Sequence, residues 1–363
     1  RLSVKTQDLC VVAAVDPGYT GVAASLNFNY SSRYDLISQL CAIGSRPNKH
    51  WFAIHDNSIK TDRLLTLVPL TSKCPIEPND RSQTLIMELF RALHHPYIYP
   101  VLDLELRNGH ALAVLPFNAR GSLKDLIYKS TWNEEYSRKY GVDGCGGASG
   151  AGLPAGQVAR FGRQILEGLL FLKDKGFPPF RHLHAGNVMV QNGVARICGL
   201  ENTLVGAAAR PALALPPAAA AEAWALARLL YEMCAAREPD EMLQLNHSGC
   251  RCYIRHVSRQ VVDIIEQILG PRPPALHELL LCELFRKIDL REMKGSCLPN
   301  FSQRLSRSCL SLLSEVRRGA GSSGSAGAGA LSPRARTPPR RYASPGPTTP
   351  ATPPSRRWVT FTH

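Results

Sequence analysis

The chain has 363 residues, of which 44% are hydrophobic. This is enough for one large or two small domains with a sizeable core. The net charge of +14 is uneven, because residues 317–363 contain eight arginines and no Asp, Glu or Lys. Charge concentrated in a tail argues against a nucleic-acid-binding protein, in which basic and aromatic residues interleave on the folded part.

The cysteines and the hydropathy of the chain indicate the cellular compartment in which the protein is expected. The 11 cysteines form no Cys-x-x-Cys pair, so we expect reduced thiols in a cytoplasmic protein rather than a disulfide framework. No apolar run reaches the length of a membrane span. Contact with a membrane is therefore expected to be peripheral, through a partner or through the basic tail.

The first third of the chain alternates strand-like runs with one helix. Residues 1–33 lack a clear period and are predicted to be a loose lead-in. A helix is predicted at 82–93, where apolar residues recur at helical spacing. Asn108-Gly109 predicts a hairpin turn. The predicted strands are residues 51–54, 64–70, 101–106 and 111–115.

Residues 121–290 are predicted to be mainly helical. A segment rich in Gly and Ala, 137–156, predicts a flexible surface loop. Asn192-Gly193 predicts a second hairpin, between short strands at 188–190 and 195–198. The predicted helices are residues 158–173, 219–235, 255–269 and 275–288.

The chain from residue 317 to 363 is dominated by Gly, Ser, Ala, Pro and Arg. Such a segment buries too little apolar surface to offset its conformational entropy, so we predict disorder. Residues 296–316 are predicted to form a helical extension before this tail.

Four local motifs resemble those of protein kinases and occur in the same order. The first follows the predicted helix at 82–93, and the second follows the predicted strand at 111–115. The third precedes the second hairpin, and the fourth lies in the predicted helix at 219–235, whose sequence is typical of a buried helix. They are His95-Pro96-Tyr97-Ile98, Gly121-Ser122-Leu123-Lys124-Asp125-Leu126, His182-Leu183-His184-Ala185-Gly186-Asn187, and Glu222-Ala223-Trp224 with Leu230-Tyr231-Glu232-Met233.

This resemblance implies an α+β, two-lobed protein-kinase-like fold. The small, β-rich lobe with one helix is predicted at 34–117 and the helical large lobe at 118–295. A narrower resemblance rests on His-Leu-His-Ala-Gly-Asn at 182–187 and Leu-Glu-Asn at 200–202. These motifs resemble the family of PX-domain kinase-like and slowpoke-binding proteins. The chain shows no PX domain, so the resemblance is closer to the slowpoke-binding members and implies a channel-binding adaptor.

The chemistry of phosphoryl transfer can be checked position by position against the kinase pattern. In the run 44–49, where a Gly-rich loop belongs, Gly44 is the one glycine. The strand lysine is replaced by Thr66, with Lys60 and Lys73 flanking the strand. The helix glutamate is replaced by Ile86, and Glu88 would face another side of the helix.

The remaining positions follow from the third motif. His182 occupies the place of the catalytic aspartate, and Asn187 matches the metal-binding asparagine. Gly199 stands where the second metal-binding aspartate belongs, and Glu201 offers a carboxylate two positions later. Loss of the lysine and both aspartates leaves too little to neutralise phosphates or orient a nucleophile. We therefore expect no catalytic residue and no cofactor, with Gly44 and Asn187 as the contacts if ATP binds.

No metal site is predicted. The His-Leu-His and His94-His95 pairs lack a nearby Cys or carboxylate cluster at ligand spacing.

The tail carries proline-directed phosphorylation motifs. Arg334 and Pro339 flank Thr337 in a pattern that resembles a site read by 14-3-3 proteins. A solvated basic linker and an SH3-binding segment are the alternative interpretations. The Ser-Pro and Thr-Pro sites are Ser332, Thr337, Ser344, Thr349 and Thr352.

Three functions remain open from the sequence. The first is an inactive kinase-like adaptor that binds and modulates a membrane partner, such as a calcium-activated potassium channel, with a phospho-regulated tail. The second is an atypical active Ser/Thr protein kinase that binds ATP and uses Glu201 and a displaced lysine. The third is a nucleotide-binding switch that transfers no phosphate.

Overall fold

The structure is a computed structural model that describes residues 33–46, 48–141, 152–209, 220–239, 258–294 and 304–321. The chain divides into two compact units, 1–323 and 324–363, and all described residues belong to the first. The predicted lead-in at 1–33 lies outside the described residues except for Arg33. So do the phosphorylation motifs of the tail.

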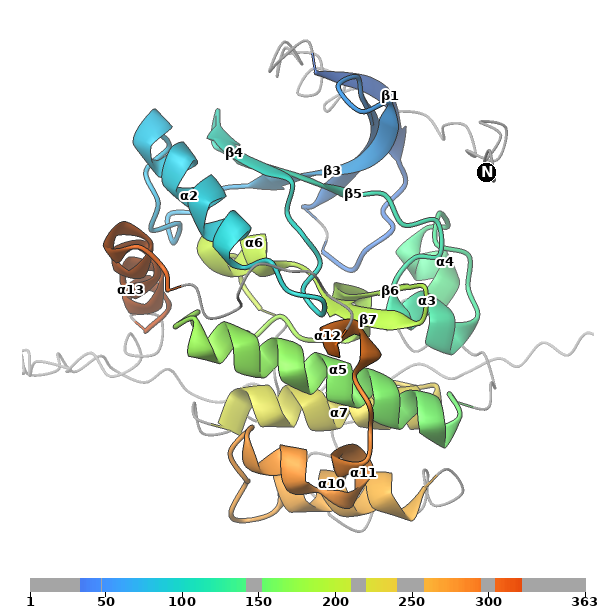
Figure 1. Ribbon diagram of the computed structural model, residues 1–363. Helices are drawn as coiled ribbons and strands as arrows, with labels where there is room; N and C mark the ends of the chain where they lie inside the picture. The colour runs from blue at the N-terminus through green and yellow to red at the C-terminus, as the bar shows by residue number, and fades with distance from the viewer. Residues whose placement is uncertain are drawn as a thin grey trace, which may run out of the picture. The chain divides into compact units, whose positions relative to one another are not determined.

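The small lobe is an antiparallel sheet in the order β1-β2-β3-β5-β4 (Figure 1). All four predicted strands are confirmed, with ends shifted by a few residues. Asn108 and Gly109 both have positive φ (49° and 74°), as a two-residue hairpin turn requires. The strands are β1 (Tyr34–Leu40), β2 (His50–Asp56), β3 (Thr61–Pro69), β4 (Asp103–Arg107) and β5 (His110–Pro116).

Helix α2 (Asp80–Ala92) covers one face of this sheet and packs against β4. Its first turn is capped by Asn79, whose side chain accepts a hydrogen bond from the backbone N–H of Ser82 at 2.8 Å. The helix buries one apolar stripe that includes Ile86 and Leu89. The helix predicted at 82–93 is therefore confirmed.

The large lobe is built on three long helices, α5 (Ala155–Asp174), α7 (Ala221–Ala235) and α10 (Arg259–Leu269), with α7 in contact with both others (Figure 1). The second hairpin, β6 (Val188–Gln191) and β7 (Val194–Ile197), lies on α5. The remaining elements are short. They are α3 (Leu123–Tyr128), α4 (Tyr136–Tyr140), η2 (Ala185–Asn187), α6 (Leu200–Leu204), η4 (Glu278–Leu281), α11 (Glu283–Arg286) and α12 (Arg291–Lys294).

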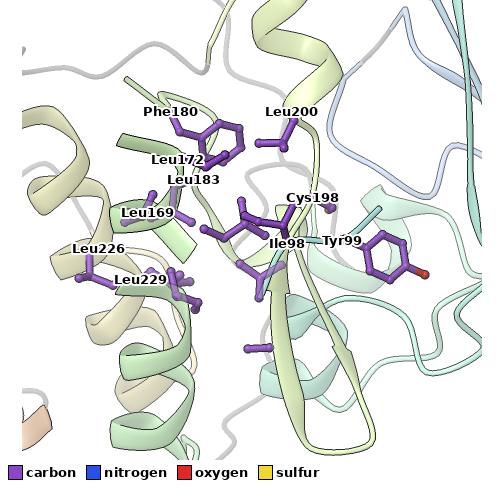
Figure 2. Close-up of a cluster of buried hydrophobic side chains, with 14 of the residues drawn as sticks. Ile98, Tyr99, Leu169, Leu172, Phe180, Leu183, Cys198, Leu200, Leu226 and Leu229 are labelled. Carbon is purple, nitrogen blue, oxygen red and sulfur yellow. The ribbon is translucent and has the colours of Figure 1, made fainter. Parts of the chain in front are cut away.

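A buried cluster joins helices α5 and α7 to the segments that carry the kinase-like motifs (Figure 2). Leu169 of α5 and Leu226 of α7 pack with Leu183, which belongs to the third motif. Ile98 enters the same cluster from the segment after α2, and its backbone bridges to Ile197 of β7. The motif loops are therefore held by core packing.

Two predictions differ from the structure. The flexible loop predicted at 137–156 is wrong at its two ends, where α4 buries Tyr140 and where the first turn of α5 begins. Residues 142–151 of the predicted loop lie outside the described part of the chain. The helix at 275–288 is two short pieces, η4 and α11, because the backbone of Cys282 between them is extended (φ −62°, ψ 146°).

The C-terminal helix α13 (Arg307–Gly321) packs against α2 (Figure 1). The Cys309 Sγ lies 3.9 Å from the carbonyl oxygen of Leu85 in α2. The Arg317 guanidinium donates to the carbonyl of Gly176 at 2.8 Å, beyond the end of α5. A tail boundary at 317 is therefore wrong, because the helix continues through Arg317 to Gly321.

None of the described helices is long and apolar enough to cross a membrane. The six described cysteines, among them Cys198 and Cys234 in the core, form no disulfide.

Candidate functional site

A cavity of about 520 Å³ opens between the sheet and the large lobe. Five of the positions singled out from the sequence line it, which places residues far apart in the chain around one space. They are Gly44, Thr66, His182, Asn187 and Gly199. Ile86 does not line the cavity, because its side chain lies fully buried in α2.

The β1–β2 loop (residues 41–49) contacts the large lobe through its first residues. The backbone N–H of Tyr136 donates to the carbonyl of Ala42 at 2.8 Å. The Cys41 thiol lies 3.0 Å from the carbonyl of Asn133. These contacts tie the loop to the start of α4, which explains why the segment around 136–140 is ordered.

Further along the same loop, Arg46 donates to the carbonyl of Ala208 at 3.1 Å, beyond α6. Gly44 sits against the ring of Trp51, where an added Cβ would lie only 2.6 Å from a ring carbon. Gly44 therefore serves close packing with Trp51, a reason for glycine that is independent of phosphate binding.

Thr66 lies in the middle of β3, paired with Trp51 of β2 and Ala113 of β5. Its side chain is 1% exposed and lines the cavity. The two lysines that flank the strand in sequence, Lys60 and Lys73, are exposed and do not line the cavity. Neither supplies the missing strand cation.

A different lysine enters the cavity. Lys49, at the end of the β1–β2 loop, donates to the Oε1 of Glu201 at 3.3 Å, and the two side chains are 12% and 4% exposed. The sequence points to Glu201 as a replacement carboxylate and does not single out Lys49. Its place at the end of the Gly44–Lys49 run was the available signal, because that run lies between the first two strands.

The loop before β6 is held by its own side chains. Asn187 donates from Nδ2 to the carbonyl oxygen of His182 at 2.9 Å. The His182 ring is buried, and burial together with the nearby charges of Arg46 and Lys49 lowers its pKa to about 4. His182 is therefore a neutral side chain in the folded protein at neutral pH.

Gly199 adopts a left-handed conformation, with φ at +86°. A Cβ at this position would lie 2.9 Å from the Nδ2 of Asn202 and 3.1 Å from the Nδ2 of Asn187. The local packing therefore excludes a larger side chain at Gly199 unless these two amides move. An aspartate cannot be restored here without disturbing the loop.

At the end of β5, the backbone carbonyl of Pro116 is also used by a contact within the chain. The Tyr99 hydroxyl donates to the carbonyl of Pro116 at 2.9 Å, and Figure 2 shows this hydroxyl directed away from the buried cluster. Pro116 has no backbone N–H to offer. Phe117 and Trp132 stack edge to face beside it, with ring centroids 5.0 Å apart.

The cavity is lined by two acidic side chains, Glu201 and Asp125. Asp125 accepts hydrogen bonds from Lys139 and Tyr140, both at 2.7 Å. These bonds and the Lys139 charge lower the pKa of Asp125 despite its burial. The motif at 121–126, which contains Asp125, does not indicate this network. Within the described ranges, no group of three or more His, Cys, Asp or Glu side chains is placed to hold a metal ion.

A sheet with one helix, followed by a helical lobe with a small hairpin and a cleft between them, is the fold of a protein kinase. The predicted fold class is thus confirmed.

Comparison with known proteins places the chain more narrowly, although no family model matches it. It is 45% identical over 309 residues to the slowpoke-binding protein of Drosophila melanogaster, covering 79% of this chain and 59% of that protein. It is 32% identical over 237 residues to the PX domain-containing protein kinase-like protein of Mus musculus, covering 62% of this chain and 39% of that protein. A probable inactive serine/threonine-protein kinase of Dictyostelium discoideum, slob2, is 36% identical over 184 residues, 48% of this chain and 31% of that protein.

These similarities confirm the resemblance drawn from the motifs. The chain is a protein-kinase-like protein related to the slowpoke-binding and PX-domain kinase-like proteins. It spans 59% of the length of the Drosophila protein and less of the other two.

Proposed function

We propose that this chain is a catalytically inactive kinase-like adaptor that binds and modulates a membrane partner of the potassium-channel class. The partner is suggested by the name of the slowpoke-binding protein, and the inactive state by the name of slob2. On this proposal the protein works in the cytoplasm and reaches the plasma membrane through its partner.

The observation that carries the inactive state is the charge balance of the cleft. Phosphoryl transfer depends on cations that neutralise the phosphates and on carboxylates that hold the metal. Here Lys49 is paired with Glu201, and Asp125 with Lys139. Hard divalent cations need several oxygen ligands, and among the described residues each lining acid already pairs with a lysine. The residues present fit a magnesium–ATP complex poorly.

Phosphate transfer tests this directly. The full chain is incubated with radiolabelled ATP, magnesium and a mixed protein substrate, beside Lys49→Met and Asn187→Ala variants. An inactive adaptor gives the same background in all three samples. Incorporation above background in the wild-type chain that is lost in Lys49→Met would overturn the proposal.

The Lys49–Glu201 pair favours one alternative, an atypical active Ser/Thr kinase that binds ATP. A lysine and a carboxylate do meet in the cleft, as a displaced catalytic pair would. A thermal-shift titration with ATP, with and without magnesium, separates the options. A magnesium-dependent shift supports the active kinase, a magnesium-independent shift supports a nucleotide-binding switch, and no shift at millimolar ATP supports the adaptor.

In the same proposal, the C-terminal tail is the part of the adaptor that phosphorylation regulates. Phosphate on Thr337 would sit among arginines and present a motif that a 14-3-3 protein reads through its own arginine cluster. Because α13 ends at Gly321, a truncation after residue 321 removes the phosphorylation sites and leaves the helix.

Partner capture tests the adaptor role. The full chain and the chain truncated after 321 are used to capture a potassium channel from solubilised membranes, with and without phosphatase treatment. The proposal expects both chains to retain the channel and expects 14-3-3 protein only with the untreated full chain. If neither chain retains the channel, the adaptor role fails.

A further inference from the structure

Helix α13 carries positive charge on the side opposite to its packing face. The packing face consists of four buried residues, which are Cys309, Leu312, Leu313 and Val316. In a helix of about 3.6 residues per turn, the residues that lie half a turn away from these share the opposite face. They are all exposed, and we call them the outer stripe: Arg307, Ser311, Ser314 and Arg318.

One flank of the outer stripe adds a further charge and apolar surface. Arg317 lies on this flank and donates to the carbonyl of Gly176 at 2.8 Å. Leu310 lies on the same flank, and its side chain is 47% exposed. Glu315, the one acidic residue of α13, lies on the other flank. Figure 1 shows the helix at the side of the lobes, next to α2.

The two arginines of the outer stripe are not neutralised by the described part of the chain. Among the residues that the structure describes, no ion pair joins Arg307 or Arg318 to a carboxylate. Arg286 of α11 differs, because it lies 3.7 Å from a carboxylate oxygen of Glu283. The charge of the outer stripe is therefore available to a partner that carries negative charge.

The sequence that follows α13 has the same sign of charge. Residues 322–363 contain six arginines and no Asp, Glu or Lys. A partner that attracts the outer stripe is therefore not repelled by the charge of the chain that continues from it.

The shape of the outer stripe favours a broad anionic surface. Arg307 and Arg318 are eleven positions apart, which is about 16 Å along the helix axis. The helix lines no part of the cavity between the lobes, so its charges form a row on the surface. Anionic lipid headgroups attract basic residues over such a width. A bilayer also accepts Leu310 at the boundary between headgroups and acyl chains, which an acidic polypeptide does not provide.

We propose that the outer stripe of α13, together with Leu310 and Arg317, docks on the anionic lipid surface of a membrane. This contact is direct and reversible, and it adds to any contact that the protein makes through a membrane partner. It does not depend on the adaptor role, because lipid alone supplies the binding surface.

Vesicle binding tests the proposed surface. The full chain is mixed with vesicles of phosphatidylcholine alone or of phosphatidylcholine with phosphatidylserine, and the bound fraction is measured by flotation. We expect binding to the phosphatidylserine vesicles and not to the neutral ones. Binding should fall steeply between about 0.1 M and about 1 M salt, where the screening length drops from about 10 Å to about 3 Å. Soluble phosphoserine at millimolar concentration should not displace the chain, because it presents no surface.

The Arg307→Gln/Arg318→Gln double variant, made in the full chain, tests the assigned residues while the tail stays intact. Each basic residue near an anionic surface strengthens binding about fivefold, so the double variant should bind about 25-fold more weakly. The matched control is Arg259→Gln/Arg286→Gln, which removes two exposed arginines from α10 and α11 and should change binding less than twofold. Arg307→Lys/Arg318→Lys keeps both charges and should also bind within about twofold of the wild type.

A second route changes the charge of the outer stripe without removing an arginine. Ser311→Glu/Ser314→Glu places two negative charges between the arginines and should weaken vesicle binding at least tenfold, on the order of two charges near the surface. This variant decides the outcome if Arg307→Gln/Arg318→Gln unfolds, which urea denaturation of each chain detects.

Four results would overturn the proposal. The first is equal binding to neutral and anionic vesicles, and the second is no binding to either. The third is unchanged binding in both outer-stripe variants, which would assign the membrane contact to another part of the chain. The fourth is a loss with polyglutamate in place of vesicles, while vesicle binding is unchanged, which would assign the outer stripe to an acidic protein. The vesicles contain no channel, so each result is separate from the outcome of the partner capture.

Discussion

The ion pair between Lys49 and Glu201 is expected to hold the two lobes together. Lys49 enters from the small lobe and Glu201 from the large lobe, 152 positions apart in the chain. Replacing Lys49 with Met keeps most of the side-chain volume and removes the charge. Glu201 then keeps a buried carboxylate without its cation.

The size of the effect follows from distance and burial. Two unit charges 3.3 Å apart attract by about 5 kcal/mol at an effective dielectric constant of about 20. The cost of desolvating both groups offsets much of this. Removing one partner of a buried pair costs about 3–5 kcal/mol, and the partial exposure of Lys49 places the expected loss at the lower end of this range, at about 3 kcal/mol.

Urea denaturation followed by circular dichroism measures this loss as a shift in midpoint. The double variant Lys49→Met/Glu201→Gln is the matched control, since it removes both charges. It should be more stable than Lys49→Met alone, by about 1–3 kcal/mol, because no uncompensated charge remains. A Lys49→Met chain within about 0.5 kcal/mol of the wild type, the range of ordinary surface changes, would refute the buried ion pair.

Three further predictions concern other parts of the described chain. The Gly199→Ala variant should be less stable than the wild type by about 1–2 kcal/mol, because residue 199 has a left-handed backbone conformation. The control is Gly156→Ala in α5, where nothing lies within 4 Å of the added Cβ, and this variant should be as stable as the wild type or more stable. Thermal melting of both variants checks this. His95 and His182 both have a folded pKa of about 4, below the ordinary value of 6.5, so the unfolded chain binds more protons between these pH values. Stability should therefore fall as pH decreases from about 6.5 to 4, by up to about 3 kcal/mol for each histidine, and urea midpoints for the wild type and His182→Gln, which should show a flatter profile, test this. Leu313→Ala, at a 1% exposed position of α13, should cost about 2–5 kcal/mol, and a melting temperature equal to that of the wild type would contradict the packing of α13 on the lobes.

Elements with a strong local pattern could be predicted from the sequence. The two Asn-Gly hairpins are set by residues that tolerate positive φ, and helix α5 is set by its apolar periodicity. Strand β1 escaped prediction because its pattern is weak. Tyr34 is its one buried residue, and Leu36 and Ile37 are exposed at the edge of the sheet, so no alternation marks it.

The sequence was enough to predict which kinase residues are missing from the site, but not which contacts take their place. The register of the motifs was enough to place Thr66, His182 and Gly199 around one cavity. The contact between Lys49 and Glu201 depends on how the β1–β2 loop closes over the large lobe, and no local rule encodes it. The failed helix at 275–288 has a similar cause, since the extended backbone at Cys282 allows Leu284 and Phe285 to be buried, and tertiary packing overrides propensity.

The positions that depart from the kinase pattern have reasons of their own in this structure. Ile86 is fully buried in the core, and Gly199 accommodates two amide groups. At each of these positions a residue that would act on a ligand is replaced by one that packs against the chain. The charges follow the same rule, because Lys49 and Glu201 neutralise each other across the lobes. Because the charges inside the cleft pair with each other, the two lobes can keep their relative positions without a bound nucleotide. A fixed arrangement of the lobes is what the proposed adaptor needs in order to present one surface to a partner.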